Sequence, residues 1–393
     1  MATKDGARRP CRWDPIVAFA LTLVVVGCGR REGAQLPAVT PAPSTTTASS
    51  PVEEEKVLNV YNWADYIDPA VIPAFEKEYR IKVNYDVFDS NDALETKLLT
   101  GKSGYDVVVP AATYLQRQIP AGVYQRLDKA LLPNLKNIDE TLSRTVEMND
   151  AGNQYGVIYD WGTAGIAYNR KKIATAMPTA PLDSFAMVFN PAVIKNFNDC
   201  GVLILDAPEV VVESVLLYLG KDPNSESIKD LKAAESVLLS IRPYVRYISS
   251  TREIDALATG EICIAFVWSS DVGQVRSRAK EAGRVIEVEY ILPKEGAMMY
   301  FDMLAIPADA PHPNNAHLFI NFLLRPEIAA RNSNLIKYAN GDTPTPAIND
   351  AVRNDPGVYP PPDVQAKFHP EPVRTPEFTR LLTRTWTRFK TGK

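Results

Sequence analysis

The stretch VLNVYNWADYI, residues 57–67, opens the folded part of the chain and decides its fold. Its first five residues predict a β-strand, and the remaining six predict a loop. Asp68 followed by Pro69 is typical of a helix start, with an N-cap residue and then a proline in the first turn. We therefore expect a strand, a loop and then a helix that ends near Tyr79.

Strands and helices continue to alternate beyond this point. Residues 81–88 and 105–110 predict strands, and residues 91–99 between them predict a helix. This alternation is typical of βαβ units and a mainly parallel sheet, so the expected fold class is α/β. Nine prolines in residues 341–376 predict an extended surface segment. Further strands are expected at residues 165–168, 202–205, 261–268, 285–292 and 298–306, and further helices at 209–219, 272–282, 317–324 and 377–390.

The length and composition bound the class of protein. A chain of 393 residues exceeds one typical hydrophobic core, so we expect two lobes. The apolar fraction of 46% is that of a soluble globular protein, and the net charge of −4 gives no support to a nucleic-acid partner. We expect residues 57–160 plus 285–340 to form lobe 1, and residues 161–284 plus 341–393 to form lobe 2.

The N-terminus has the features of an export signal. Three arginines precede an eleven-residue apolar run, 16–26, which is too short to span a bilayer comfortably. The run leads into Val25-Val26-Gly27-Cys28, which resembles the lipobox of bacterial lipoproteins. We expect residues 1–27 to be a lipoprotein signal peptide and residues 28–56 to be a lipidated Cys28 with a flexible tether. A simple secretory signal is the alternative.

The cysteines agree with export. Cys11 leaves with the signal and Cys28 is used for the lipid, which leaves Cys200 and Cys263. In an oxidising compartment these two favour one disulfide, with two buried free thiols as the alternative.

Motifs for catalysis are missing from the sequence. Its three histidines, His312, His317 and His369, have no spacing typical of a metal site or a triad. No nucleophile elbow, phosphate-binding loop or dinucleotide fingerprint is present. We expect no enzyme activity, no cofactor and no metal, although a carboxylate pair alone can serve a glycosidase.

Aromatic residues stand beside carboxylates where strands end. Carboxylates can neutralise a buried ammonium ion, and aromatic faces add cation–π attraction of roughly 0.5–2 kcal/mol each. Aromatics also cover methylene groups, at about 0.8 kcal/mol per buried CH₂. These are the parts of a diamine receptor, and they occur as Trp63 with Asp65 and Tyr66, Trp268 with Asp271, and Tyr300 with Asp302.

Structural interpretations compete with this one. Asp271 could be the N-cap of a helix, Asp65 could cap a turn, and Trp268 could be a core residue. Asp302 is different, because it interrupts an apolar strand where an unpaired charge would be costly.

Several longer strings carry a resemblance to a known family. They closely resemble periplasmic polyamine-binding proteins of bacterial ABC importers, and most of all the putrescine-binding member, over nearly all of residues 57–393. The strings are Val60-Tyr61-Asn62-Trp63-Ala64-Asp65-Tyr66-Ile67, Tyr85-Asp86-Val87-Phe88-Asp89-Ser90-Asn91, Leu205-Asp206-Ala207-Pro208-Glu209, Gly220-Lys221-Asp222-Pro223-Asn224-Ser225 and Pro293-Lys294-Glu295-Gly296-Ala297.

The resemblance implies a two-lobed type II periplasmic binding protein fold with crossing hinge strands. It implies a periplasmic monomer, anchored only through Cys28, that passes a small cationic polyamine to an ABC permease. It also implies a Cys200–Cys263 disulfide and a family aromatic at Trp161, with core packing as an equal alternative there. The ligand-binding residues that it implies are Trp63, Asp65, Tyr66, Glu209, Trp268, Asp271, Tyr300, Asp302 and Tyr338.

Departures from the family pattern leave the ligand open. Val210 stands where putrescine binders have a second Glu for the distal amine, beside the retained Glu209, and Ala64 and Ala111 replace serines. Tyr300 replaces a Phe or Trp. We expect putrescine or a close relative, with spermidine, agmatine, a monoamine or an ω-amino acid, or a polyamine-sensing role, as alternatives.

Overall fold

A computed structural model describes residues 54–393. The expected signal peptide, Cys28 and most of the expected tether lie outside these residues. Glu54 already belongs to the folded body, because its carboxylate accepts hydrogen bonds from the backbone N–H groups of Asn314 and Asn315, each at 3.0 Å. The expected tether, residues 28–56, therefore includes Glu54, which the structure places in the folded body. The cause is an acidic side chain that caps the first turn of a helix from far away in sequence.

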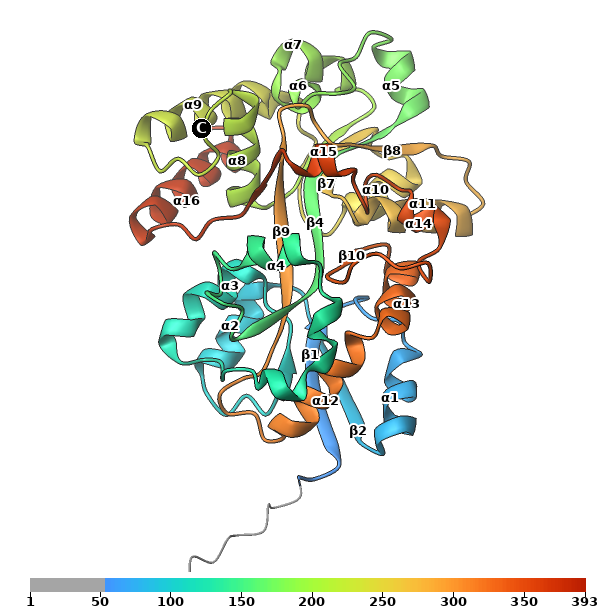
Figure 1. Ribbon diagram of the computed structural model, residues 1–393. Coiled ribbons are helices and arrows are strands. Elements are labelled where there is room, and N and C mark those ends of the chain that lie inside the picture. Colours follow the sequence, from blue (N-terminus) through green and yellow to red (C-terminus); the bar gives the residue numbers. More distant parts are fainter. Residues whose placement is uncertain (1–53) are drawn as a thin grey trace, which may run out of the picture. The chain divides into compact units, whose positions relative to one another are not determined.

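The first lobe is built on three parallel strands. β1 (Val57–Trp63) lies between β2 (Lys82–Phe88) and β3 (Val107–Val108) and runs parallel to both. Alternate residues of β1 are buried, and Leu58 and Val60 enter a hydrophobic core with α1 (Val71–Tyr79) and α12 (Pro313–Leu323). The other helices of this lobe are α2 (Asn91–Leu99), α3 (Ala112–Gln118), α4 (Glu140–Val146) and α13 (Pro326–Ile336) (Figure 1).

The second lobe repeats this plan. β5 (Val202–Ile204) lies between β6 (Tyr247–Ile248) and β7 (Ile264–Trp268) and is parallel to both. The C-terminal helix α16 (Pro376–Thr391) packs Phe378, Leu382, Trp386 and Phe389 into the core of this lobe. The other helices are α5 (Arg170–Ala176), α6 (Ala186–Phe189), α7 (Pro191–Ile194), α8 (Pro208–Tyr218), α9 (Ile228–Ile241), α10 (Glu253–Thr259) and α11 (Asp271–Glu281).

Two long strands join the lobes. β4 (Gly156–Asn169) and β9 (Ala297–Ala305) are antiparallel neighbours and lie side by side in Figure 1. Val157 and Leu304, at one end of this pair, belong to the core of the first lobe, whereas Ile166 and Met298 belong to that of the second. The sheet order is β2-β1-β3-β9-β4-β7-β5-β6. The expected mainly parallel sheet is therefore mixed, because these crossing strands run antiparallel to their neighbours β3 and β7.

Two segments pack differently from the lobe boundaries expected above. β8 (Val288–Ile291) pairs with the end of β4 that belongs to the second lobe. Ile348, Val352 and Val358 pack instead in a cluster with Leu94 and Leu115 of the first lobe. The lobe to which each of these segments belongs is therefore set by long-range packing and not by its position in the sequence.

The proline-rich segment 341–376 is mostly irregular, but it is not the single extended surface segment that was expected, because short helices and a strand interrupt it and Ile348, Val352 and Val358 are buried. It carries only short elements, which pack on both lobes and include one strand beside a crossing strand. The elements within the segment are α14 (Asp350–Arg353), α15 (Pro362–Gln365) and β11 (Phe368–Pro370). The short strand β10 (Ala339–Asn340) directly precedes the segment.

Cys200 and Cys263 form a disulfide, with their Cα atoms 5.4 Å apart. The two residues precede the neighbouring parallel strands β5 and β7, so strand pairing brings them together. The alternative of two free thiols is excluded.

The start of α1 corrects one local expectation. The helix begins at Val71 rather than after Asp68, because the Asp68 carboxylate accepts a hydrogen bond from the backbone N–H of Ala70 and also pairs with Arg331. The loop after β1 is thus fixed by contacts to α13 as well as by its own sequence.

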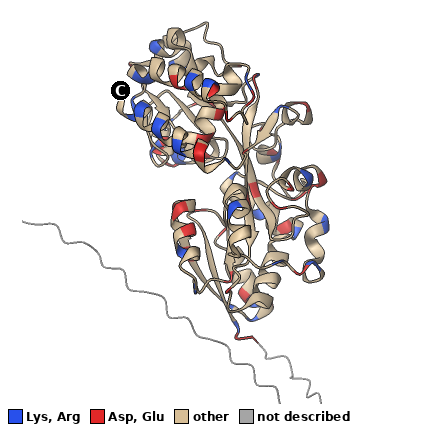
Figure 2. Ribbon diagram, turned by 90° about the vertical axis from the view of Figure 1, so that its left-hand side faces the viewer, with Lys and Arg blue, Asp and Glu red and all other residues tan. Residues whose placement is uncertain are grey.

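Acidic and basic residues are interspersed over both lobes (Figure 2). Of the helices in residues 54–393, none is long and apolar enough to cross a membrane.

Candidate functional site

Asp302 lies in the middle of β9 and is the central acid of the candidate site. Its side chain is 7% exposed, and Tyr66, from the loop after β1, donates a hydrogen bond from its hydroxyl to Oδ2 at 2.6 Å. Burial raises the pKa of Asp302 to about 7, although the Tyr66 hydroxyl opposes this shift. No Lys, Arg or His of residues 54–393 forms an ion pair with it. A carboxylate in this position lacks a cation of its own.

Asp271 is a second buried acid, at the first residue of α11. It is 5% exposed, and its Oδ2 atom has no hydrogen-bond partner within the described chain. Burial, and then the Glu253 carboxylate, raise the pKa of Asp271 well above its usual range. Ser270, and not Asp271, is the N-cap residue, so the helix-cap alternative is not what the structure shows.

Aromatic rings surround the two acids. Tyr66 and Tyr338 meet edge to face with centroids 4.8 Å apart, and Trp268 meets Tyr300 at 5.0 Å. The hydroxyls of Ser270 and Tyr300 are 3.2 Å apart. Burial, then Tyr338, and then Asp302 and Asp271 raise the pKa of Tyr300, and burial followed by Asp271 and Asp302 raises the pKa of Tyr338.

Trp63 and Asp65 are less closely joined to this cluster. The Trp63 indole donates to the Val109 carbonyl at 3.0 Å, and its ring contacts Phe88. Asp65 is exposed and takes a left-handed φ of 55°, a conformation that Asp tolerates better than most residues. Within residues 54–393, no hydrogen bond joins Asp65 to the buried acids. Trp161 packs in the core, with its indole directed to the Asn340 carbonyl.

The distal end of the candidate site contains two glutamates. Val210 is 2% exposed and packs in the core of the second lobe, so its side chain is structural. Glu209 stands next to it in the first turn of α8, and burial raises its pKa. Glu371 follows β11, and its backbone N–H donates to the Met299 carbonyl at 3.1 Å, which places it beside Tyr300. Burial, and then Glu213, Glu209 and Asp302, raise the pKa of Glu371 well above its usual range.

Sequence reasoning missed two acids in this region. Glu371 lies in the proline-rich segment, where no periodicity marks it as close to a strand. Asp160 interrupts the buried strand β4 just as Asp302 interrupts β9, and that interruption was a usable signal.

Two crossing strands that join α/β lobes, with buried acids and aromatics on and beside them, define a binding protein of the type II periplasmic class. The chain belongs to the family described as bacterial extracellular solute-binding protein, whose model matches residues 70–360.

Within this family, the chain is similar to individual proteins that are named as putrescine-binding. The chain is 47% identical over 366 residues to the putrescine-binding periplasmic protein SpuD of Pseudomonas aeruginosa, covering 93% of this chain and 100% of SpuD. It is also 47% identical over 343 residues to the putrescine-binding periplasmic protein PotF of Escherichia coli, covering 86% and 93%.

A solved structure agrees on the fold. The spermidine/putrescine ABC transporter substrate-binding protein PotD of Streptococcus pneumoniae matches with a TM-score of 0.75 and 24% identity, over 86% of this chain and 99% of that one. The expected two-lobed type II fold with crossing strands is confirmed.

Proposed function

We propose that this protein captures putrescine or a closely related polyamine and delivers it to the permease of an ABC importer. The observation that carries the proposal is Asp302, a buried carboxylate with one hydroxyl donor and no cationic partner among residues 54–393. An ammonium ion supplies the missing charge and up to three N–H donors. The 47% identity to two proteins that are named as putrescine-binding supports the same ligand.

The two ends of a diamine have separate partners in this proposal. Asp302 and Asp271 hold the proximal ammonium, while Tyr66, Trp268, Tyr300 and Tyr338 cover the methylene chain. Glu209 and Glu371 hold the distal ammonium in place of an acid at Val210. Trp63 and Asp65 belong to the entrance of the site.

Binding without catalysis is part of the proposal. Two of the three histidines have structural partners, since His312 pairs with Asp106 at 3.0 Å and His317 is bonded to the backbone of Asp128 and Pro313. Among the described residues, no group of three or more His, Cys, Asp or Glu side chains is placed to hold a metal ion.

Calorimetry of the purified protein against an amine panel tests the function. The panel is putrescine, cadaverine, agmatine, spermidine, butylamine and 4-aminobutanoate, added after bound ligand has been removed by unfolding and refolding. We expect putrescine to bind most tightly, and butylamine to bind more weakly because it leaves Glu209 and Glu371 unpaired. Absence of heat with every amine would rule out the polyamine proposal, and tighter binding of 4-aminobutanoate would favour the ω-amino acid alternative.

Replacing Glu209 or Glu371 with Gln is expected to weaken putrescine binding about two- to fivefold each, since ion pairs of partly exposed groups are worth up to about 1 kcal/mol. Butylamine binding should stay unchanged, because this ligand lacks the distal ammonium. Glu377→Gln removes the same charge from an exposed site on α16 and serves as the control. Equal losses for putrescine and butylamine would contradict the distal assignment.

We also propose that the lobes close around the ligand by bending at β4 and β9. In this proposal the first lobe comprises residues 57–160, 297–340 and 348–358. The second lobe comprises residues 161–284, β8 and the C-terminal helix α16. Small-angle X-ray scattering should show a smaller radius of gyration when putrescine is added, and an unchanged radius would oppose closure.

Export and anchoring complete the proposal. Residues 1–27 are removed, Cys28 is acylated, and the segment up to Glu54 tethers a monomeric body in the periplasm. Mass spectrometry of the isolated protein would show a diacylglyceryl-modified Cys28 at its N-terminus, and an unmodified N-terminus would refute the anchor.

A further inference from the structure

Asp160 is a buried acid on β4, one of the two crossing strands. It is 0% exposed, and neither carboxylate oxygen has a hydrogen-bond partner within residues 54–393. In the register of β4 and β9, Asp160 lies directly opposite Asp302. Side chains that face each other across an antiparallel pair have Cβ atoms roughly 4.5–5.5 Å apart. Asp160 is therefore the closest acid on the neighbouring strand to the proposed ammonium site.

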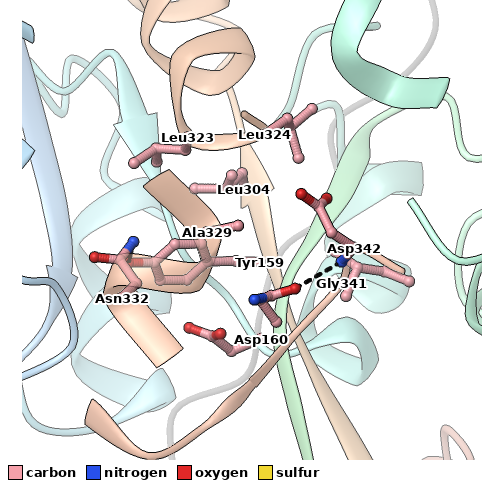
Figure 3. Close-up of a pocket in the computed structure, with 11 residues that line it drawn as sticks. Tyr159, Asp160, Leu304, Leu323, Leu324, Ala329, Asn332, Gly341 and Asp342 are labelled. Atoms are coloured by element: carbon pink, nitrogen blue, oxygen red, sulfur yellow. Dashed lines mark hydrogen bonds between the residues drawn. The ribbon is translucent and has the colours of Figure 1, made fainter. Parts of the chain in front are cut away.

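A small cavity of about 10 Å³ lies beside Asp160 (Figure 3). It is large enough for one water molecule. Asp342 also lines it, and the Asp342 Oδ2 atom is likewise unpaired within the described chain. The neighbouring amide of Asn332 is engaged elsewhere, since its Oδ1 accepts from the Asp68 N–H and its Nδ2 donates to the Tyr159 hydroxyl. The remaining walls include Leu304, Leu323 and Leu324, so the surroundings do not compensate a negative charge.

Two carboxylates this close cannot both ionise without a cation between or beside them. Burial, and then Asp302 and Asp342, raise the pKa of Asp160 well above its usual range, whereas Tyr66 favours the ionised form of Asp302. Asp302 thus ionises first and Asp160 keeps its proton. The titratable groups that face Asp160 from the elements packed around it are Asp302, Asp342, Tyr66, Tyr159, Tyr338 and Tyr359.

We propose that Asp160 is a further acid of the amine site, neutral in the ligand-free protein and ionised when an ammonium ion is held at Asp302. This inference rests on the proposed function. The O–H bond of Asp160 breaks on binding, its electron pair stays on the carboxylate, and the proton leaves to solvent. The ligand's positive charge then faces the carboxylate of Asp160 in addition to those of Asp302 and Asp271, which favours an amine over any ligand with a neutral or anionic group at this end.

Calorimetry of putrescine binding at about pH 8, in phosphate and in Tris, measures the number of protons released, because the two buffers differ in ionisation enthalpy. We expect the wild-type protein to release at least one proton per ligand, because the buried acids that meet the ammonium groups lose their protons on binding. Asp160→Asn should lower this release by about one proton per ligand and weaken binding about tenfold. Asp342→Asn, the same substitution in the same cavity but without a place opposite Asp302, removes only one of the charges that raise the pKa of Asp160 and should change both quantities less than Asp160→Asn does.

The outcomes separate the two proposals. If the wild-type protein binds no amine, the proposed function fails and this inference falls with it. If it binds putrescine but Asp160→Asn matches the wild type in affinity and proton release, Asp160 is only a structural acid. Equal effects of Asp160→Asn and Asp342→Asn would also overturn the assignment. If Asp160→Asn does not fold, infrared difference spectra of the wild type decide, since loss of a protonated-carboxyl band on amine binding is expected and its absence would refute the inference.

Discussion

Asp302→Asn is expected to weaken putrescine binding by about 30-fold to a few thousand-fold. Removing one partner of a buried charge pair costs roughly 2–5 kcal/mol, largely because the ammonium ion is then left in a dry site without a counter-charge. Asn still accepts the Tyr66 hydrogen bond, so the melting temperature should stay within a few degrees of the wild type. Calorimetry and thermal unfolding of the same preparation measure both quantities.

The control for this variant is Asp86→Asn, which removes one negative charge from an exposed position on β2. It should bind putrescine like the wild type. The pH dependence gives a second check. Because the pKa of Asp302 is about 7, more of this acid is protonated as pH falls below that value, and wild-type affinity should fall with it. An Asp302→Asn protein that binds nearly as tightly as the wild type would show that Asp302 is structural.

Removing the Cys200–Cys263 disulfide is expected to lower the free energy of unfolding by about 4 kcal/mol. The bond closes a long loop, with a sequence separation of 63, and loop closure of this size removes much conformational entropy from the unfolded chain. Urea unfolding of the Cys200→Ser, Cys263→Ser double variant, compared with the wild type, measures the difference.

Reducing agent provides the matched control. It should shift the unfolding midpoint of the wild type towards that of the double variant and leave the double variant itself unmoved. A difference below about 1 kcal/mol would mean that the second lobe is stabilised almost wholly by its packing.

Local patterns predicted most of the elements. α2 occupies residues 91–99 as expected, with Ser90 as a side-chain cap, and the apolar run at 298–306 became β9 with a shift of one residue. The mixed sheet was not predictable in this way, because strand direction at β4 depends on pairing with β7 and β9, far away in sequence. The predicted start of α1 was wrong for the same reason, because Asp68 forms an ion pair with Arg331, which is far away in sequence.

The residues of the candidate site also divide into those that local sequence predicts and those that depend on long-range pairing. Asp302 was predicted as a site residue because an unpaired charge inside an apolar strand is costly and indicates a functional role. Asp160 satisfies that test equally, but its importance depends on facing Asp302, which only the register of the two strands reveals. Glu371 had no local signal, because its place beside Tyr300 comes from pairing between β11 and β9.

The placement of Asp160 and Asp302 on the two strands that connect the lobes has a consequence for how such a protein can change its ligand. A substitution at either position would change the charge at the proposed amine site and also the packing of the strands about which the lobes are proposed to move. We therefore expect variants with a changed ligand preference to carry further substitutions along β4 and β9, away from the ligand itself.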